Sequence, residues 1–175
     1  MFEEMQATRI DSLGGPGSST TSASQSSRSV PFIELRNILP SNVNVVSPFV
    51  DQLMRFISRF RGRDEDNFEI DLVLHEALVN AIVHGNQENP DKRVYVCCRC
   101  TKDGEVSITI RDEGRGFDSE AVPDPTVPEN LFRGSGRGIY LMRTLMDEVH
   151  FEQRGTVVHM CKRAKAQSGS KREAI

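Results

Sequence analysis

Three polar side chains recur at every fourth position of segment 75–85, namely Glu76, Asn80 and His84. Residues four apart lie on the same side of an α-helix, so a carboxylate, an amide and an imidazole would form one row. Glu76 and His84 are of kinds that ligate metals, but the HExxH spacing of helical zinc sites is absent. Taken alone, the row also fits an exposed polar stripe on an amphipathic helix.

A second candidate site follows the strand that ends near residue 111, where Asp112 precedes Gly114 and Gly116. A carboxylate there can accept a hydrogen bond from an exocyclic amine such as that of adenine, and glycines let the backbone approach a ligand closely. An ordinary Asp-Gly turn is the alternative. Gly155 and Thr156 lie in the last hairpin, and the Thr156 hydroxyl would lie beside Asp112 if the two strands are neighbours, although threonine is common in strands for packing reasons alone.

The third candidate is the run Gly134, Ser135, Gly136, Arg137 and Gly138, which enters a predicted helix. Alternating glycines before a helix leave backbone N–H groups free to hold phosphate oxygens. The Arg137 guanidinium can meet a phosphate with two hydrogen bonds. A flexible hinge is the alternative for such a loop.

The elements that must position these residues follow from the hydrophobic pattern. Residues 30–38 predict a strand, and two helices with apolar residues at three- and four-residue intervals follow it. Four further strands and a helix complete the order: strands 93–100 and 105–111, helix 138–146, and strands 147–153 and 156–162. This order predicts an α/β two-layer sandwich, with a mixed, mostly antiparallel sheet and helices on one face. No GxxxxGK[ST] motif is present, which argues against a P-loop NTPase.

The domain is predicted to span residues 30–163, between a disordered Ser/Gly-rich tail at 1–29 and a flexible basic tail at 164–175. A net charge of -3 and a pI near 5.8 argue against direct nucleic-acid binding. No apolar run approaches the roughly 20 residues that span a bilayer, so membrane association is not expected. The N-terminus has no apolar signal-peptide core, so a cytoplasmic location is the expectation.

Three cysteines crowd into the predicted strand 93–100. Because side chains alternate along a strand, Cys98 and Cys100 should share one face and Cys97 the other. Reduced thiols packed in the structure are the expected state, since paired CxxC-like spacing is absent; a metal or redox role is the alternative.

Taken together, the motifs resemble the GHKL superfamily of ATPases and kinases, which has the Bergerat ATP-binding fold. The likeness is greatest to the anti-sigma factor serine kinases of partner-switching systems, and it spans about residues 31–163. The family pattern E-A-x-x-N-A-x-x-H-G matches residues 76–85, and D-x-G-x-G-F-D matches residues 112–118. The glycine-rich helix start matches residues 136–147, with Ile139 in place of the usual leucine, and the final Gly-Thr matches residues 155 and 156.

The resemblance implies a role for each matched residue, with ATP and Mg²⁺ as the cofactors. Asn80 would ligate Mg²⁺, and Glu76 would act as the general base. Asp112 would bind the adenine amine with support from Thr156. Gly114 and Gly116 would let the adenine ring approach the backbone closely. The phosphates would be held by four residues of the glycine-rich run, Gly134, Gly136, Arg137 and Gly138. Arg137 would also offset charge in the transition state. His84 would either contact phosphate or act as a favourable charge at the helix C-terminus.

The implied function is that of a serine/threonine protein kinase that acts as an anti-sigma factor and phosphorylates an anti-sigma factor antagonist of the STAS type. Its partners would be a sigma factor and that antagonist. Two alternatives remain: an ATP-binding partner-switching module without kinase activity, and a histidine-kinase remnant, for which residues before 31 leave little room for a phosphoacceptor domain. The resemblance also implies a homodimer, formed through the first strand and helix.

Overall fold

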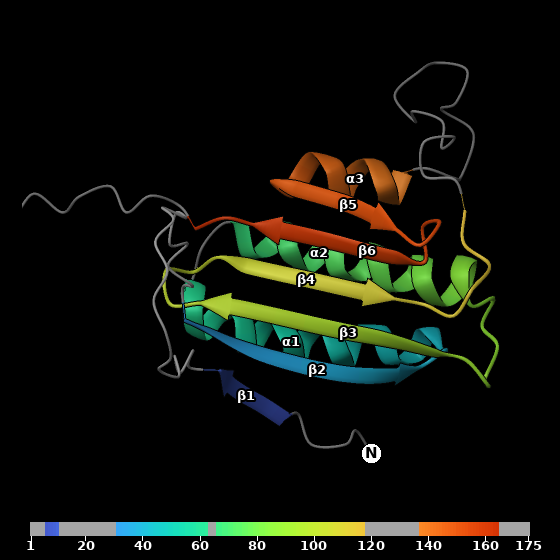
Figure 1. Ribbon diagram of the computed structural model, residues 1–175, viewed down its shortest axis with the longest axis horizontal. Coiled ribbons are helices and arrows are strands. Elements are labelled where there is room, and N and C mark those ends of the chain that lie inside the picture. Colours follow the sequence, from blue (N-terminus) through green and yellow to red (C-terminus); the bar gives the residue numbers. More distant parts are fainter. Residues whose placement is uncertain (1–5, 11–30, 63–65, 118–136, 165–175) are drawn as a thin grey trace, which may run out of the picture.

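The computed structural model describes residues 6–10, 31–62, 66–117 and 137–164, which form one sheet covered by helices (Figure 1). The sheet has six strands in the order β1-β2-β3-β4-β6-β5, and every pair of neighbours is antiparallel. The strands are β1 (Gln6–Ile10), β2 (Phe32–Pro40), β3 (Arg93–Thr101), β4 (Val106–Arg111), β5 (Glu148–Glu152) and β6 (Val157–Lys162). The mixed sheet predicted from the sequence is therefore fully antiparallel within the described residues.

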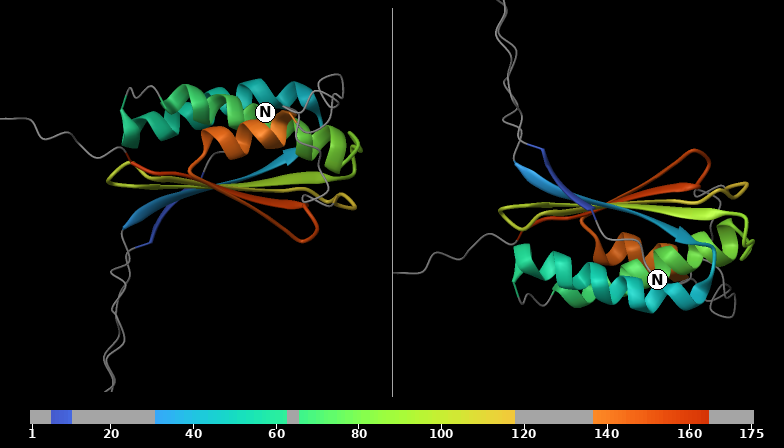
Figure 2. Two further views of the ribbon diagram at one scale, coloured as in Figure 1. Left: turned by 90° about the horizontal axis from the view of Figure 1, so that it is seen from above. Right: turned by 90° about the horizontal axis from the view of Figure 1, so that it is seen from below.

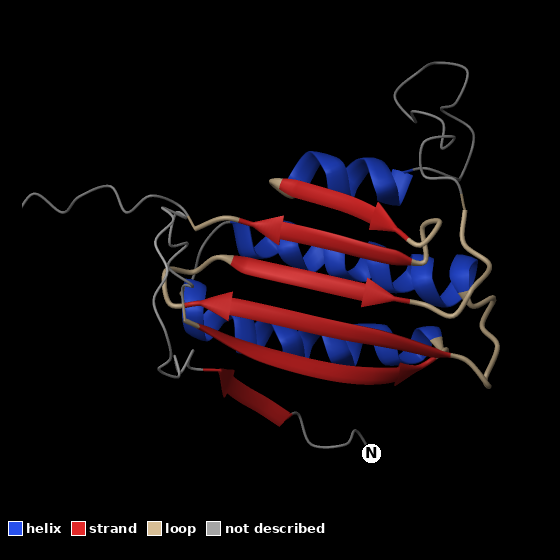
Figure 3. Cartoon of the chain, viewed as in Figure 1, coloured by secondary structure: helices blue, strands red, loops and turns tan. Residues whose placement is uncertain are grey.

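The helices lie on one face of this sheet and leave its other face uncovered in the described part of the chain (Figure 2). They are the short 3₁₀ helix η1 (Val43–Val45), α1 (Val46–Arg61), α2 (Asp66–Val79), the π-helix η2 (Asn80–Gly85) and α3 (Arg137–Leu145). The predicted two-layer α/β sandwich is confirmed (Figure 3). Among the described helices, none combines the length and the apolar character needed to cross a membrane.

The core lies between the helices and the sheet. Apolar residues of α1 recur with helical spacing and are buried, among them Phe49, Leu53 and Ile57. Side chains on alternate positions of β3, including Cys98 and Cys100, enter the same core, while Cys97 lies on the opposite face as predicted. Burial of this apolar surface is the main favourable term that holds the two layers together.

Two features differ from the sequence-based expectation. Residues 6–10, expected to lie in a disordered tail, form β1 and pair with β2 from Gln6–Arg36 to Ile10–Phe32. The helix predicted to end near residues 85 and 86 changes from α to π geometry at Asn80. Neither feature has a strong local signal, because a short edge strand without alternating apolar residues resembles a loop, and a wide helical turn keeps the same apolar spacing.

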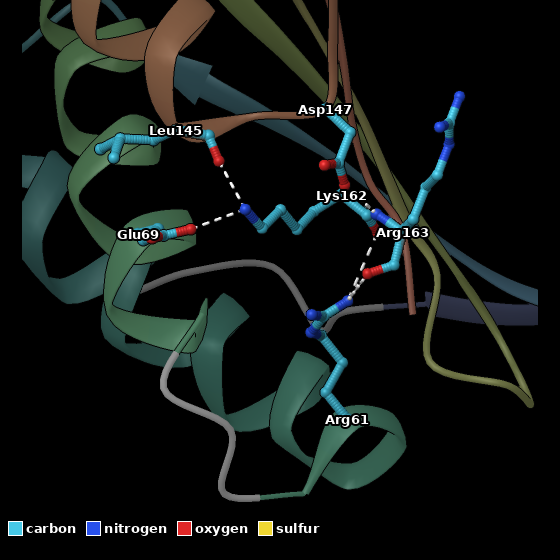
Figure 4. A network of polar contacts seen from close by, with 6 residues as sticks. All are labelled: Arg61, Glu69, Leu145, Asp147, Lys162 and Arg163. Atoms are coloured by element: carbon cyan, nitrogen blue, oxygen red, sulfur yellow. Dashed lines mark hydrogen bonds and ion pairs between the residues drawn. The ribbon is translucent and has the colours of Figure 1, made fainter. Parts of the chain in front are cut away.

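A polar network fixes the ends of the helices at one end of the molecule (Figure 4). The Lys162 ammonium donates to Glu69 of α2 at 2.6 Å and to the Leu145 carbonyl at the end of α3 at 2.7 Å. The Arg61 guanidinium of α1 donates to the carbonyls of Gly104 and Arg163. Because the C-terminus of α3 is tied near the start of α2, the N-terminus of α3 lies beside the second half of α2.

Candidate functional site

The first turn of α3 lies directly against two polar side chains of the neighbouring helix. A Cβ placed on Gly138 would lie 2.8 Å from Glu76 Oε2 and 2.9 Å from Asn80 Nδ2. Glycine therefore lets the α3 backbone approach these two groups without displacing them, whereas any side chain here would push them aside. The structure therefore brings together three residues that the sequence analysis placed in one site: Glu76, Asn80 and Gly138.

Asn80 begins the π-helix η2, in which the turns are wider than in an α-helix. The clearest mark of this geometry is the Asn86 N–H, which donates to the Ala81 carbonyl five residues earlier at 2.8 Å. His84 lies in the last turn of η2 and is exposed. This position agrees with the alternative in which His84 acts as a charge at the helix C-terminus. Single π turns inside helices are often found at functional sites.

Asp112 lies at the end of β4, against the C-terminus of η2. A Cβ on Gly85 would lie 2.5 Å from the Asp112 Cγ, so the helix end and the carboxylate are in direct contact. The Gly114 N–H donates to Asp112 Oδ1 at 2.7 Å and holds the side chain in place. Burial raises the pKa of Asp112, and the Gly114 hydrogen bond offsets part of that rise. Asp112 is thus an oriented, half-buried acceptor.

The last hairpin supports this carboxylate through the backbone. β4 and β6 are neighbours, and the Asp112 N–H donates to the Thr156 carbonyl at 3.0 Å. The predicted proximity of Thr156 to Asp112 is therefore present, but the Thr156 hydroxyl donates to the Gln153 carbonyl at 3.0 Å. Gly116 lies against the Arg154 carbonyl in the same hairpin. The hairpin and the Asp112 loop form one packed unit.

Asn86 is a site residue whose role the sequence did not reveal. Its side chain is fully buried, with Oδ1 accepting from the Glu113 N–H at 2.8 Å and Nδ2 donating to the Arg93 carbonyl at 3.0 Å. The Glu113 carboxylate accepts from the Arg93 N–H at 2.8 Å and from the Tyr95 hydroxyl at 3.0 Å. This closed ring joins the end of η2, the start of β3 and the loop after β4. A glycine followed by asparagine predicts only a helix C-cap, so the sequence carries no signal for the ring.

The glycine-rich loop is described only in part. Gly134 and Gly136, predicted to contact phosphate, lie outside the described residues. Arg137 is the first residue of α3 and is exposed. Of the predicted phosphate-binding set, the structure therefore places Arg137 and Gly138 at the N-terminus of α3, beside Glu76 and Asn80.

This two-layer sandwich sets a carboxylate of α2 and an amide of η2 against the first turn of α3, an arrangement that suits the binding of a phosphate group. Residues 39–162 match the model of the histidine kinase-like ATPase domain, and the chain belongs to this family, whose membership implies ATP binding. Among curated proteins it is similar to the anti-sigma F factor of Heyndrickxia coagulans, with 37% identity over 124 residues, 67% of this chain and 78% of that protein. It is also similar to the anti-sigma F factor of Priestia megaterium, with 36% identity over 113 residues, 61% of this chain and 76% of that protein.

Proposed function

We propose that this protein is an ATP-dependent serine/threonine kinase of the cytoplasm that binds a sigma factor and phosphorylates a STAS-type antagonist of that binding. The family supplies the ATP-binding domain, and the relatives are named as anti-sigma F factors. The observation that carries the proposal is the contact between Gly138, Glu76 and Asn80. It sets a carboxylate and an amide at the N-terminus of α3, where backbone N–H groups and the helix dipole favour phosphate.

The residues present fit the chemistry of phosphoryl transfer. Glu76 is partly buried and has an acceptor oxygen at the α3 N-terminus, so it can take the proton from an attacking serine or threonine hydroxyl. The hydroxyl oxygen then forms a bond to the γ-phosphorus as the bond to the bridging oxygen breaks, and ADP leaves with that electron pair. Arg137 at the start of α3 offsets charge on the transferred group.

The other residues bind and orient the nucleotide. Asn80 presents one neutral amide at the phosphate end of the site, which suits Mg²⁺, an ion that keeps several waters and phosphate oxygens as ligands. Bound there, Mg²⁺ would supply charge neutralisation on the phosphates. Asp112, held by the Gly114 N–H, accepts a hydrogen bond from the adenine amine. Gly114 and Gly116 let the loop that carries it pack against the Gly85 and Arg154 carbonyls.

The direct test uses the full chain, ATP labelled on the γ-phosphate, and each STAS-type protein encoded in the same genome. ATP binding is measured in parallel by calorimetry with and without Mg²⁺. Label that moves to a serine or threonine of one partner supports the kinase. ATP binding without transfer to any partner supports instead the alternative, an ATP-binding partner-switching module without kinase activity.

Replacing Gly138 with alanine should slow phosphoryl transfer while leaving the stability of the fold nearly unchanged. The new methyl group meets the flexible ends of Glu76 and Asn80, which can move aside, so the free energy of unfolding should change by less than about 1 kcal/mol. Both functional groups are displaced, and misplacement by about 1 Å can reduce a rate by roughly 100-fold. The measurement is labelled transfer beside urea unfolding, with Ser47→Ala in the first turn of α1 as the control. Undiminished transfer by the variant would remove the contact as support for the proposal.

A further inference from the structure

Lys162 is a mostly buried lysine that contacts both of the helices that carry the candidate site (Figure 4). It is the last residue of β6, and its side chain is 12% exposed. The ammonium donates to Glu69 Oε2 of α2 at 2.6 Å and to the Leu145 carbonyl at the end of α3 at 2.7 Å. An ammonium is favoured at this carbonyl because the C-terminus of a helix carries partial negative charge. Lys162 therefore joins the sheet, the first half of α2 and the end of α3.

The same two helices, which run antiparallel, meet again at the candidate site, where Gly138 lies against Glu76. Glu69 and Glu76 are seven residues apart on α2. Gly138 and Leu145 are likewise seven residues apart on α3. At about 1.5 Å per residue, each interval measures about 10.5 Å along its helix axis. Because the two intervals match, a contact that is fixed at Lys162 also fixes the contact at Gly138.

Apolar packing constrains the position of α3 along α2 only weakly. α3 has nine residues, all described, and its one buried side chain is Met142. Methionine is unbranched and adapts to irregular gaps, so it holds the helix against the core without fixing where the helix lies along its axis. Hydrogen bonds of Asp147 with Cys161 and Arg163 tie the turn after α3 to the end of β6, but they do not reach α2. The Lys162 ammonium, by contrast, reaches both helices.

We propose that Lys162 is a positioning residue for the nucleotide: by fixing α3 along α2, it holds the N-terminus of α3 where the ATP phosphates bind. The inference rests on the proposed function, which assigns the phosphates to this helix start. Lys162 touches no phosphate itself and acts through Gly138 and the N–H groups in the first turn of α3. Charge-assisted hydrogen bonds need short distances and good alignment, so a displaced α3 holds phosphate less well.

The adenine end of the site is held independently of this lysine. The Asp112 N–H donates to the Thr156 carbonyl just before β6 begins, whereas Lys162 is the last residue of that strand. At about 3.3 Å per residue, the strand sets Thr156 and Lys162 about 20 Å apart. Loss of the ammonium should therefore weaken binding of the phosphates without weakening binding of the base. Adenosine and ATP, which differ only in the triphosphate, separate these two effects.

Calorimetry with ATP and with adenosine, each in the presence of Mg²⁺, tests the proposal on the full chain. Lys162→Met keeps most of the side-chain volume and removes the ammonium. It should lower ATP affinity by about tenfold or more, as expected for the loss of a hydrogen bond to a charged group, and leave adenosine affinity unchanged. Lys102→Met is the matched control, because it makes the same change at an exposed position in the turn between β3 and β4. Both of its affinities should equal those of the wild type.

Two variants of Glu69 test the other end of the link and decide the question if Lys162→Met does not fold. Glu69→Ala removes the acceptor, whereas Glu69→Gln keeps an oxygen that can accept from the Lys162 ammonium. Both variants lose the same charge, so the difference between them reports the link alone. Glu69→Ala should lower the ratio of ATP affinity to adenosine affinity, and Glu69→Gln should retain most of that ratio.

The proposal is overturned if folded Lys162→Met keeps the wild-type ratio of the two affinities, if the two Glu69 variants give the same ratio, or if the wild type binds ATP no better than adenosine. A purely structural role would lower the unfolding temperature and leave the ratio measured on the folded protein unchanged. Failure of the proposed kinase activity would appear differently, as a wild type that binds ATP and transfers label to no partner. In that case the affinity ratio still decides the role of Lys162.

Discussion

Replacing Glu76 with glutamine is expected to reduce phosphoryl transfer by about 10²- to 10⁴-fold, the usual contribution of a positioned general base. Glutamine keeps the volume of the side chain that faces Gly138 and Asn80, so the packing at the start of α3 is preserved. An amide, however, cannot take the proton of the attacking hydroxyl. ATP affinity should therefore change little, and the loss should appear in the rate of transfer measured at saturating ATP.

A second carboxylate on the same helix provides the control for this experiment. Asp71 lies one to two turns before Glu76, is partly exposed and contacts His75, and Asp71→Asn removes the same charge without altering the site. It should transfer phosphate at the rate of the wild type. If Glu76→Gln retains phosphoryl transfer, a group other than Glu76 must accept the proton of the attacking hydroxyl. Loss of ATP binding by this variant would instead give Glu76 a role in holding the nucleotide.

Much of the fold could be predicted because burial follows simple periods in this chain. The apolar residues of α1 recur at helical spacing, and those of β3 alternate, so both the element type and the buried face follow from the sequence. β1 could not be predicted in this way. Its pairing with β2 depends on backbone hydrogen bonds to an edge that only the folded sheet presents.

The residues of the candidate site also differ in whether the sequence could predict them. The motifs that contain Glu76, Asn80 and Asp112 resemble those of an ATP-binding family, which is what predicted their roles, and the structure places the first two beside Gly138. Asn86 acts through contacts with Glu113 and Arg93, which lie far from it in sequence and come together only when η2, β3 and β4 pack. No local pattern encodes such a ring. The π turn at Asn80 likewise keeps the apolar spacing of the helix, so spacing alone does not show it.

Replacing Asn86 with alanine should weaken ATP binding by about 10- to 100-fold, because the Glu113 N–H and the Arg93 carbonyl each lose a part-buried hydrogen bond and the surrounding loop must move to satisfy them. The Glu113 N–H and the Arg93 carbonyl both depend on the Asn86 amide. Glu113 follows Asp112 directly, so a shift of the loop changes the direction of the carboxylate that we propose to face adenine. The measurement is ATP affinity by calorimetry, at a temperature where circular dichroism shows the variant to be folded.

Comparison of nucleotides distinguishes positioning of Asp112 from a general loss of stability. If Asn86 orients the adenine acceptor, the Asn86→Ala variant should lose affinity for ATP and retain its weaker affinity for GTP, so discrimination between the two bases falls. A purely structural role would lower the unfolding temperature and leave discrimination by the folded protein unchanged, which would contradict the prediction. Asn89→Ala is the matched control, because Asn89 accepts from the Asp91 N–H in an exposed turn three residues away and contributes nothing to the ring. Its ATP affinity and its base discrimination should equal those of the wild type.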